Sequence, residues 1–128
     1  MGLFSRKKRP DVQPEAPAPA AGAAEGQAVI THLRLSDDEF GTKQEREAVF
    51  ELEARLVPAV AAIGCDHDGN EFGGGEATLY TYGPDADALF AVVQDSLRGF
   101  DVRPGSYAIK RYGDIRHRDV REERVELA

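Results

Sequence analysis

The sequence predicts an α+β fold of the ferredoxin-like type, in which one antiparallel sheet carries two helices on a single face. Apolar and polar side chains alternate, as in half-buried strands, over residues 28–35, 76–82 and 106–112. Residues 42–63 and 84–98 instead carry apolar side chains at helical spacing. With a short strand before residue 76, the order is strand, helix, strand, strand, helix, strand, and right-handed crossovers then give a two-layer sandwich.

The first strand is expected over residues 28–35. Two sets of side chains alternate there: Val29, Thr31, Leu33 and Leu35 on one face, Ile30, His32 and Arg34 on the other. We therefore expect one face to meet the core and the other to remain partly exposed.

The clearest helix begins at Thr42. Thr42 and Glu45 have the spacing of a capping box, in which each side chain accepts a free backbone N–H of the first turn. An apolar stripe follows at steps of three and four residues: Val49, Leu52, Leu56, Val60 and Ile63. Pro58 removes one helical hydrogen bond, so we expect it to bend the helix or to split off its last turn before Gly64.

Glycine, aspartate and asparagine dominate residues 65–75, which read CDHDGNEFGGG. These residue types favour turns, so we expect a short strand near residues 64–67 followed by a loop. The strand over residues 76–82 alternates two sets of side chains: Ala77, Leu79 and Thr81 on one face, Thr78, Tyr80 and Tyr82 on the other.

The second helix is expected to have Pro84 at its first position, where the missing N–H costs nothing. Its buried stripe comprises Ala86, Leu89, Phe90, Val93 and Leu97. The last strand of the sandwich is expected over residues 106–112. Val125 and Leu127 belong either to a short fifth strand at the C-terminus or to a frayed end.

Residues 1–27 are expected to form a disordered basic arm and an Ala/Pro-rich linker, which leaves residues 28–128 as a single domain. Residues 14–24 read PEAPAPAAGAA, and the prolines favour extended backbone. The arm carries a run of four cations: Arg6, Lys7, Lys8 and Arg9. This run suits either a weak contact with an anionic membrane or nucleic acid, or simply a solubilising start.

Charge and hydropathy exclude several classes of protein. The net charge is −7, and residues 28–101 contain five basic and fifteen acidic residues. Such a surface repels phosphate, so general nucleic-acid binding by the domain is not expected. No apolar run approaches the roughly 20 residues of a membrane helix, and no secretory signal follows the basic run. The single cysteine cannot form an intramolecular disulfide.

The stretch DGNEFGGGEATLYTYGPDADALF, residues 68–90, resembles a recurrent segment in a family of small uncharacterised bacterial proteins. The similarity extends over roughly residues 30–113. The family has no established activity, so the resemblance implies no catalytic residue and no ligand. It implies a bacterial, cytoplasmic protein with helices and strands.

The best group of ligating side chains lies in residues 65–76. Asp66, Asp68 and Asn70 alternate as at the start of an EF-hand loop, but Glu71 stands where that loop requires glycine. A turn is therefore favoured over a divalent-metal site, and no metal or cofactor is expected.

The same segment gives weaker support to two other kinds of site. Cys65 and His67 would point the same way in a strand and suggest a thiolate–imidazole nucleophile or a zinc site. The further groups that either chemistry needs are not evident, so a buried structural cysteine is favoured. Residues 73–75 are glycines without the Gly-Lys-Ser/Thr of a phosphate-binding loop, and they suit a tight turn.

The remaining candidate is the sheet face that the helices leave open. We expect Arg34, Tyr80, Tyr82 and Arg111 to contact a protein partner or a second copy of the chain there. His32 lies beside them, and the last strand adds aromatic and basic side chains from a set that alternation does not narrow: Tyr107 or Tyr112, and Arg111 or Lys110. Tyrosines that only cover one another, or an RNA-stacking platform, are the alternatives.

The sequence as a whole favours a non-enzymatic interaction or regulatory module that acts through this face. The alternative is a small enzyme or a divalent-metal-binding protein centred on residues 65–76.

Overall fold

The fold is that of a computed structural model, which describes residues 26–113 and 120–128. Its elements are, in chain order, β1 (Gln27–Arg34), α2 (Lys43–Ala62), β2 (Asp66–Gly73), β3 (Glu76–Gly83), α3 (Ala86–Ser96), β4 (Tyr107–Arg111) and β5 (Glu122–Glu126). The α+β class is confirmed, and so is the fifth strand. The arm and linker predicted for residues 1–27 lie outside the described residues, apart from the last two.

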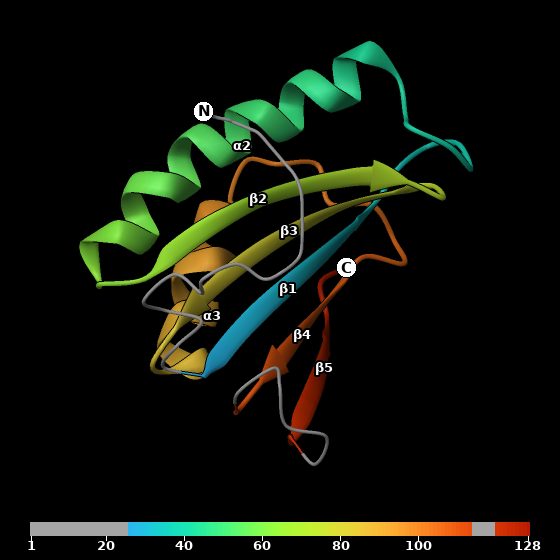
Figure 1. The fold of residues 1–128 in the computed structure, drawn as a ribbon. Coiled ribbons are helices and arrows are strands. Elements are labelled where there is room, and N and C mark those ends of the chain that lie inside the picture. The colour runs from blue at the N-terminus through green and yellow to red at the C-terminus, as the bar shows by residue number, and fades with distance from the viewer. Residues whose placement is uncertain (1–25, 114–119) are drawn as a thin grey trace.

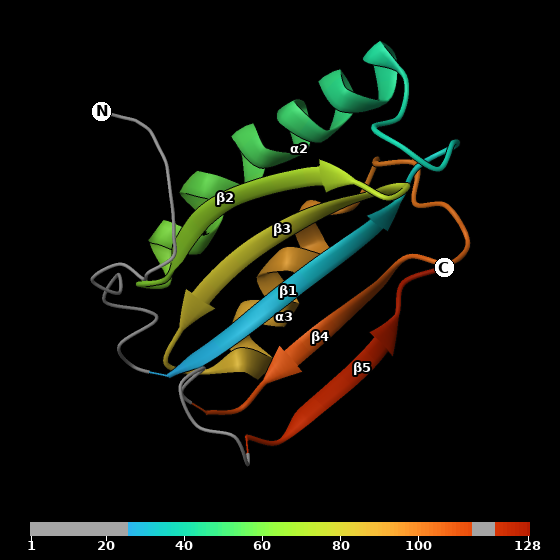
Figure 2. The same ribbon diagram turned by 45° about the vertical axis from the view of Figure 1, so that its right-hand side comes forward.

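A single antiparallel sheet contains all five strands, in the order β2-β3-β1-β4-β5. The first strand in the chain is thus the central one. Both helices lie on the same face of the sheet and contact each other, as Figures 1 and 2 show. Within the described residues no helix covers the opposite face, which we call the helix-free face.

The core lies between the sheet and the helices. The residues of β1 and β3 that were predicted to face inward are buried: Val29, Thr31, Leu33, Ala77, Leu79 and Thr81. The predicted helix stripes complete the core, with Val49, Leu52, Leu56 and Val60 from α2 and Ala86, Leu89, Phe90 and Val93 from α3. The prediction is wrong at Ile63, which follows the last turn of α2 and is 43% exposed.

The capping box of α2 is confirmed. Thr42 Oγ1 accepts the Glu45 N–H at 3.0 Å, and Glu45 Oε1 accepts the Thr42 N–H at 2.9 Å. Pro58 does not split the helix, which continues to Ala62. Leu56 and Val60 are buried on either side of Pro58, and tertiary packing of this kind supplies most of the stability of a helix in a protein.

The predicted start of α3 is wrong by two residues, because Pro84 precedes the helix. Asp85 is the N-cap, and its Oδ1 accepts the backbone N–H groups of Asp87 and Ala88 at 3.0 and 3.2 Å. An aspartate at the N-cap accepts two backbone N–H groups that would otherwise be unpaired. A proline at the first helical position only lacks one such N–H group.

The loop predicted within residues 65–75 is wrong. β2 occupies most of that segment and pairs with β3, with a bulge between His67 and Gly69. The β-propensity of these residues is low, but hydrogen bonds to β3 hold them in the sheet. The predicted turn is confined to Gly74 and Gly75, whose φ angles of 61° and 82° suit a two-residue hairpin turn.

This hairpin turn is held against the segment that leads into α2. The Leu35 N–H donates to the Gly75 carbonyl at 2.8 Å, and the Gly75 N–H donates to the Glu39 carbonyl at 2.9 Å. A Cβ at residue 75 would lie 2.8 Å from the Asp37 carbonyl oxygen and 2.9 Å from Arg34 Nη1. The close approach therefore requires glycine, as the positive φ also does.

Candidate interface on the helix-free face

Rows of side chains cross the helix-free face, because directly paired residues of neighbouring strands point to the same side. The first row contains Asp66, Tyr82, Ala28, Arg111 and Glu122, from β2 to β5. The second contains Gly69, Tyr80, Ile30, Ile109 and Arg124. The third contains Glu71, Thr78, His32, Tyr107 and Glu126.

All four residues predicted to contact a partner belong to this face. Tyr82 and Arg111 lie in the first row, and Tyr80 lies in the second. Arg34 ends β1 and pairs with Glu76 beyond the third row. Each of the four predicted contact residues is half-buried, so part of every side chain remains accessible.

The structure settles the choice left open in the last strand. Tyr107 and Arg111 point to the helix-free face, in register with His32 and Ala28 of β1. Lys110 and Tyr112 lie on the helix side, where Lys110 Nζ and the Tyr112 hydroxyl donate to Asp87 Oδ1 of α3 at 3.0 and 2.6 Å.

Side chains of the third row pack against one another. The rings of His32 and Tyr107 stack with 4.5 Å between their centroids, and the Arg124 guanidinium carbon lies 3.6 Å from the Tyr107 ring centre. His32 Nδ1 lies 3.1 Å from Glu76 Oε1. Tyr107 is thus covered on both sides by side chains of this protein. Tyr80 and Tyr82 lie in the other two rows and, like Tyr107, are half-buried.

The hydroxyls of these two tyrosines remain protonated at neutral pH. Burial is the main cause that raises the pKa of Tyr80, and the hydrogen bond that it donates to Glu71 Oε1 at 2.6 Å acts in the same direction. Burial also raises the pKa of Tyr82 to about 12, with a contribution from the negative charge of Asp68. Both side chains can therefore act as hydrogen-bond donors.

Each cation of the face has a nearby acidic group: Arg34 with Asp38, Arg111 with Glu122 and Arg124 with Glu126. Arg111 is the most constrained of the three, because its side chain is 19% exposed. Its Nε is buried and has no hydrogen-bond partner among the described residues. A buried donor of this kind is costly, so the position of Arg111 is not explained by fold stability alone.

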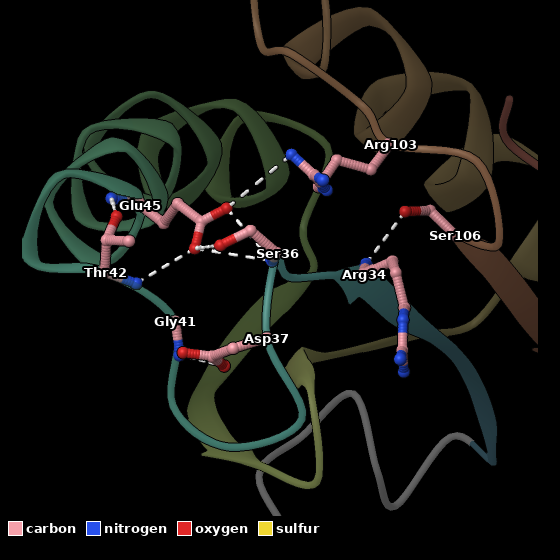
Figure 3. A network of polar contacts seen from close by, with 8 residues as sticks. All are labelled: Arg34, Ser36, Asp37, Gly41, Thr42, Glu45, Arg103 and Ser106. Carbon is pink, nitrogen blue, oxygen red and sulfur yellow. Dashed lines mark hydrogen bonds and ion pairs between the residues drawn. The ribbon is translucent and has the colours of Figure 1, made fainter.

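Sequence patterns did not reveal a polar network that borders the face at the start of α2 (Figure 3). The Glu45 carboxylate accepts the Ser36 hydroxyl at 2.9 Å and the Ser36 N–H at 3.1 Å, in addition to its capping bond. Arg103 Nη1 lies 3.9 Å from the same carboxylate. Ser106 Oγ accepts the Arg34 N–H at 2.8 Å, which ties the end of β1 to the start of β4.

A cavity of about 330 Å³ opens beside this network. Glu45 and Asp101 line it together with Arg34 and Arg103. Charges of both signs are present, and Glu45 already faces Arg103. The lining therefore does not select a ligand of one charge.

The hydrogen bonds of Glu45 should make the stability of the fold depend on pH in the acid range. Hydrogen bonds from the Thr42 backbone and from Ser36 hold the pKa of Glu45 below its ordinary value of 4.5. A carboxylate with a lowered folded-state pKa contributes stability above its unfolded pKa and loses it as the pH falls through the folded value. We expect Glu45→Gln to lower the free energy of unfolding by about 1 kcal/mol at pH 7, and this difference should shrink below about pH 4.5.

Urea unfolding of both chains between about pH 7 and pH 3 measures this difference. Glu47→Gln, an exposed glutamate on the same helix, is the matched control. A Glu45→Gln difference that stays constant over this range would show that the network is not held by the ionised carboxylate.

The other functional candidate, Cys65 with His67, lies on the opposite side of the sheet. His67 Nε2 is 2.6 Å from Glu53 Oε2 of α2, and Asn70 Nδ2 donates to Glu53 Oε1 at 2.7 Å. Asp66 instead shares the helix-free face with Tyr82. The potential ligands of residues 65–76 are thus divided between the two faces. Within residues 26–113 and 120–128 no group of three or more His, Cys, Asp or Glu side chains is arranged to hold a metal ion.

No protein-family model, no curated protein and no solved structure matches this chain. Among the helices of the described segments, none is both long and apolar enough to span a membrane.

Proposed function

We propose that the domain is a non-enzymatic protein-interaction or regulatory module that binds a partner through its helix-free face. The observation that carries the proposal is the common location of Arg34, Tyr80, Tyr82 and Arg111 on that face. Tyrosine and arginine are the residue types that interfaces favour. The two tyrosines present partly accessible rings, and the mixed charges around them provide polar contacts for a rim.

The edges of the sheet support a contact by the face rather than by strand addition. The outer strand β5 has the sequence EERVE, and charged side chains discourage pairing with another strand. At the other edge, the bulge and Gly69 interrupt β2. Both features are ways in which proteins protect sheet edges.

We also propose a more specific fold class within the α+β class. We assign the domain to the ferredoxin-like class, with β5 added beside β4. The element order up to β4 and the antiparallel pairing of every neighbouring strand support this assignment. Membership of the bacterial family that residues 68–90 resemble, and a cytoplasmic location, remain predictions.

The test begins with the partner that co-purifies stably with the full chain, or with the dimer if the chain self-associates. Tyr80→Ala combined with Tyr82→Ala is expected to weaken that complex at least tenfold, because truncated aromatic anchors typically cost about 2 kcal/mol each. The fold should survive, since both rings lie outside the core. Titration calorimetry measures the affinity, and sedimentation equilibrium measures a dimer.

Phe40→Ala is the matched control, because Phe40 is an aromatic residue that is 56% exposed in the segment before α2. It should leave the affinity unchanged. If the tyrosine pair alters only the unfolding temperature, with an unchanged affinity, the helix-free face is not the binding surface.

A further inference from the structure

α2 carries a second apolar stripe, on the side that faces away from the sheet. Its members are exposed and recur at steps of four, three and four residues: Phe50, Ala54, Val57 and Ala61. Phe50 and Val57 are 51% and 47% exposed. Single exposed apolar side chains are ordinary on a protein surface, but a continuous stripe marks a contact surface. We call this set the outer stripe of α2.

The two flanks of the outer stripe differ in chemistry. On the flank towards β2, Phe50 meets Phe72 edge to face, with 5.8 Å between the ring centroids. On the flank towards α3, Glu51 and Arg55 are exposed, and Arg55 Nη2 donates to the Ser96 carbonyl at 3.3 Å. A guanidinium has five N–H donors, so Arg55 can bond an additional carboxylate. The outer stripe thus runs between an apolar flank and a charged flank.

This pattern is complementary to itself when two α2 helices pack antiparallel. A two-fold axis that passes between residues 53 and 54 brings like flanks of the two copies together. At a rise of about 1.5 Å per residue, Phe50 is then level with Val57 of the second copy, and Glu51 is offset along the axis by only about 1.5 Å from Arg55 of the second copy. Symmetry makes each contact twice. Ala54 lies beside the axis, where a small side chain lets the helices approach closely.

We infer that the chain forms a two-fold dimer in which the outer stripe of α2 packs antiparallel against the same stripe of a second copy. Burial of Phe50 and Val57 provides the apolar contribution. Reciprocal ion pairs between Glu51 and Arg55 fix the register, because charged pairs confer specificity more than affinity. A parallel pair would place the charged flank of each helix against the apolar flank of the other, so the charge pattern selects the antiparallel arrangement.

The dimer leaves the helix-free faces of both copies accessible. α2 and the helix-free face lie on opposite sides of the sheet, so the two faces point away from each other (Figures 1 and 2). One pair of helices buries less surface than most permanent interfaces, and we therefore expect a reversible dimer. A partner with two copies of its binding segment would gain avidity from it.

Disulfide cross-linking of the full chain with diamide tests the register. Ala54→Cys should form an intermolecular cross-link, because Cα atoms beside the axis come within the range that a disulfide spans. Glu47→Cys is exposed on the same side of α2. It should not cross-link, since an antiparallel pair separates the two copies of residue 47 by about 20 Å along the axis. The native chain gives the baseline, because its single cysteine is buried.

Cross-linking has two outcomes that contradict the inference. Cross-links at both positions would indicate a parallel pair. The absence of a cross-link at residue 54 would show that the outer stripes do not meet.

Charge reversal provides an independent test. Glu51→Arg and Arg55→Glu each place like charges opposite one another, so each should weaken the dimer by about tenfold at about 0.1 M NaCl. Sedimentation equilibrium measures the affinity. An equimolar mixture of the two variants should form heterodimers in preference to either homodimer, because both ion pairs between the copies are then restored with reversed sign.

The mixture separates contact between copies from changes within one helix. Each variant keeps like charges at residues 51 and 55 of its own chain, so an effect on the helix alone would give no preference for heterodimers. Glu39→Arg is the matched control, since it makes the same change of charge at an exposed position before α2. It should leave the affinity unchanged. A mixture without preference, or a native chain that stays monomeric at millimolar concentration, would overturn the inference.

Val57→Glu distinguishes this inference from the proposed function, because it places a charge opposite Phe50 of the second copy. It should dissociate the dimer and leave the affinity for a partner on the helix-free face unchanged. If Tyr80→Ala with Tyr82→Ala dissociates the dimer and Val57→Glu does not, only this inference fails. If Val57→Glu dissociates the dimer and the tyrosine pair changes no complex, only the proposed function fails.

Discussion

Glu53→Ala is expected to lower the free energy of unfolding by about 3 kcal/mol, one of the two largest effects that we predict for a single substitution. Glu53 joins α2 to β2 through His67 Nε2 at 2.6 Å and Asn70 Nδ2 at 2.7 Å. The side chains of His67 and Glu53 are only 6% and 13% exposed. Without the carboxylate, a buried imidazole would keep neither of its nitrogens paired, since Nδ1 has no hydrogen-bond partner among the described residues.

Urea unfolding measures the loss, with Glu51→Ala as the matched control because Glu51 is exposed on the same helix. The control should change stability by less than about 0.5 kcal/mol. Glu53→Gln keeps a hydrogen-bond acceptor for one neighbour, so its loss of stability should lie between those of Glu53→Ala and Glu51→Ala. Combining Glu53→Ala with His67→Ala should cost less than the sum of the single changes, because they remove one shared interaction. Additive losses would show that the two side chains do not support each other.

Gly83→Ala is expected to destabilise the fold by about 2–3 kcal/mol, at the upper end of what overpacking costs. A Cβ at residue 83 would overlap Cys65 Sγ and would lie 3.2 Å from Cys65 Cβ. Cys65 is a buried member of the core and has little room to yield. Thermal unfolding monitored by circular dichroism measures the effect.

Removing the thiol provides the control for this clash. Cys65→Ala combined with Gly83→Ala should recover most of the stability that Gly83→Ala loses, although Cys65→Ala alone is mildly destabilising. Gly73→Ala is a second control, since a Cβ there would meet no atom within 4 Å. If the double variant is no more stable than Gly83→Ala, the cost comes from the backbone and not from the thiol.

Periodicity and capping were sufficient to predict much of this fold. The alternation in residues 28–35 separated buried Val29 and Leu33 from half-buried Ile30 and His32. The spacing of Thr42 and Glu45 located the start of α2. Both signals are local, because they depend on geometry repeated within one strand or one helical turn.

β2 could not be predicted in the same way. Its residues, DHDGNEFG, have little tendency to form strands by themselves, and its place in the sheet depends on β3. The sequence therefore suggested two separate candidates, an acidic loop and a tyrosine-bearing strand. The observed register places Asp66 and Glu71 on the same face as Tyr80 and Tyr82.

The contact between Glu53 and His67 was also hidden in the sequence. These residues are 14 positions apart, on a helix and on a strand that was not expected to extend so far. The only available signal was an acidic residue between the buried positions Leu52 and Leu56 of α2. A glutamate there is more often simply solvated, so the pattern does not indicate a partner.

The reciprocal hydrogen bonds between the hairpin turn and the segment before α2 have a consequence for local opening. Gly75 both donates to Glu39 and accepts from Leu35, so this single residue holds two distant parts of the chain together. The turn cannot leave its position without exposing the amide of Leu35 as well as its own. These two amides should therefore exchange with solvent deuterium at similar rates, as members of one cooperative opening unit that includes the entry to α2.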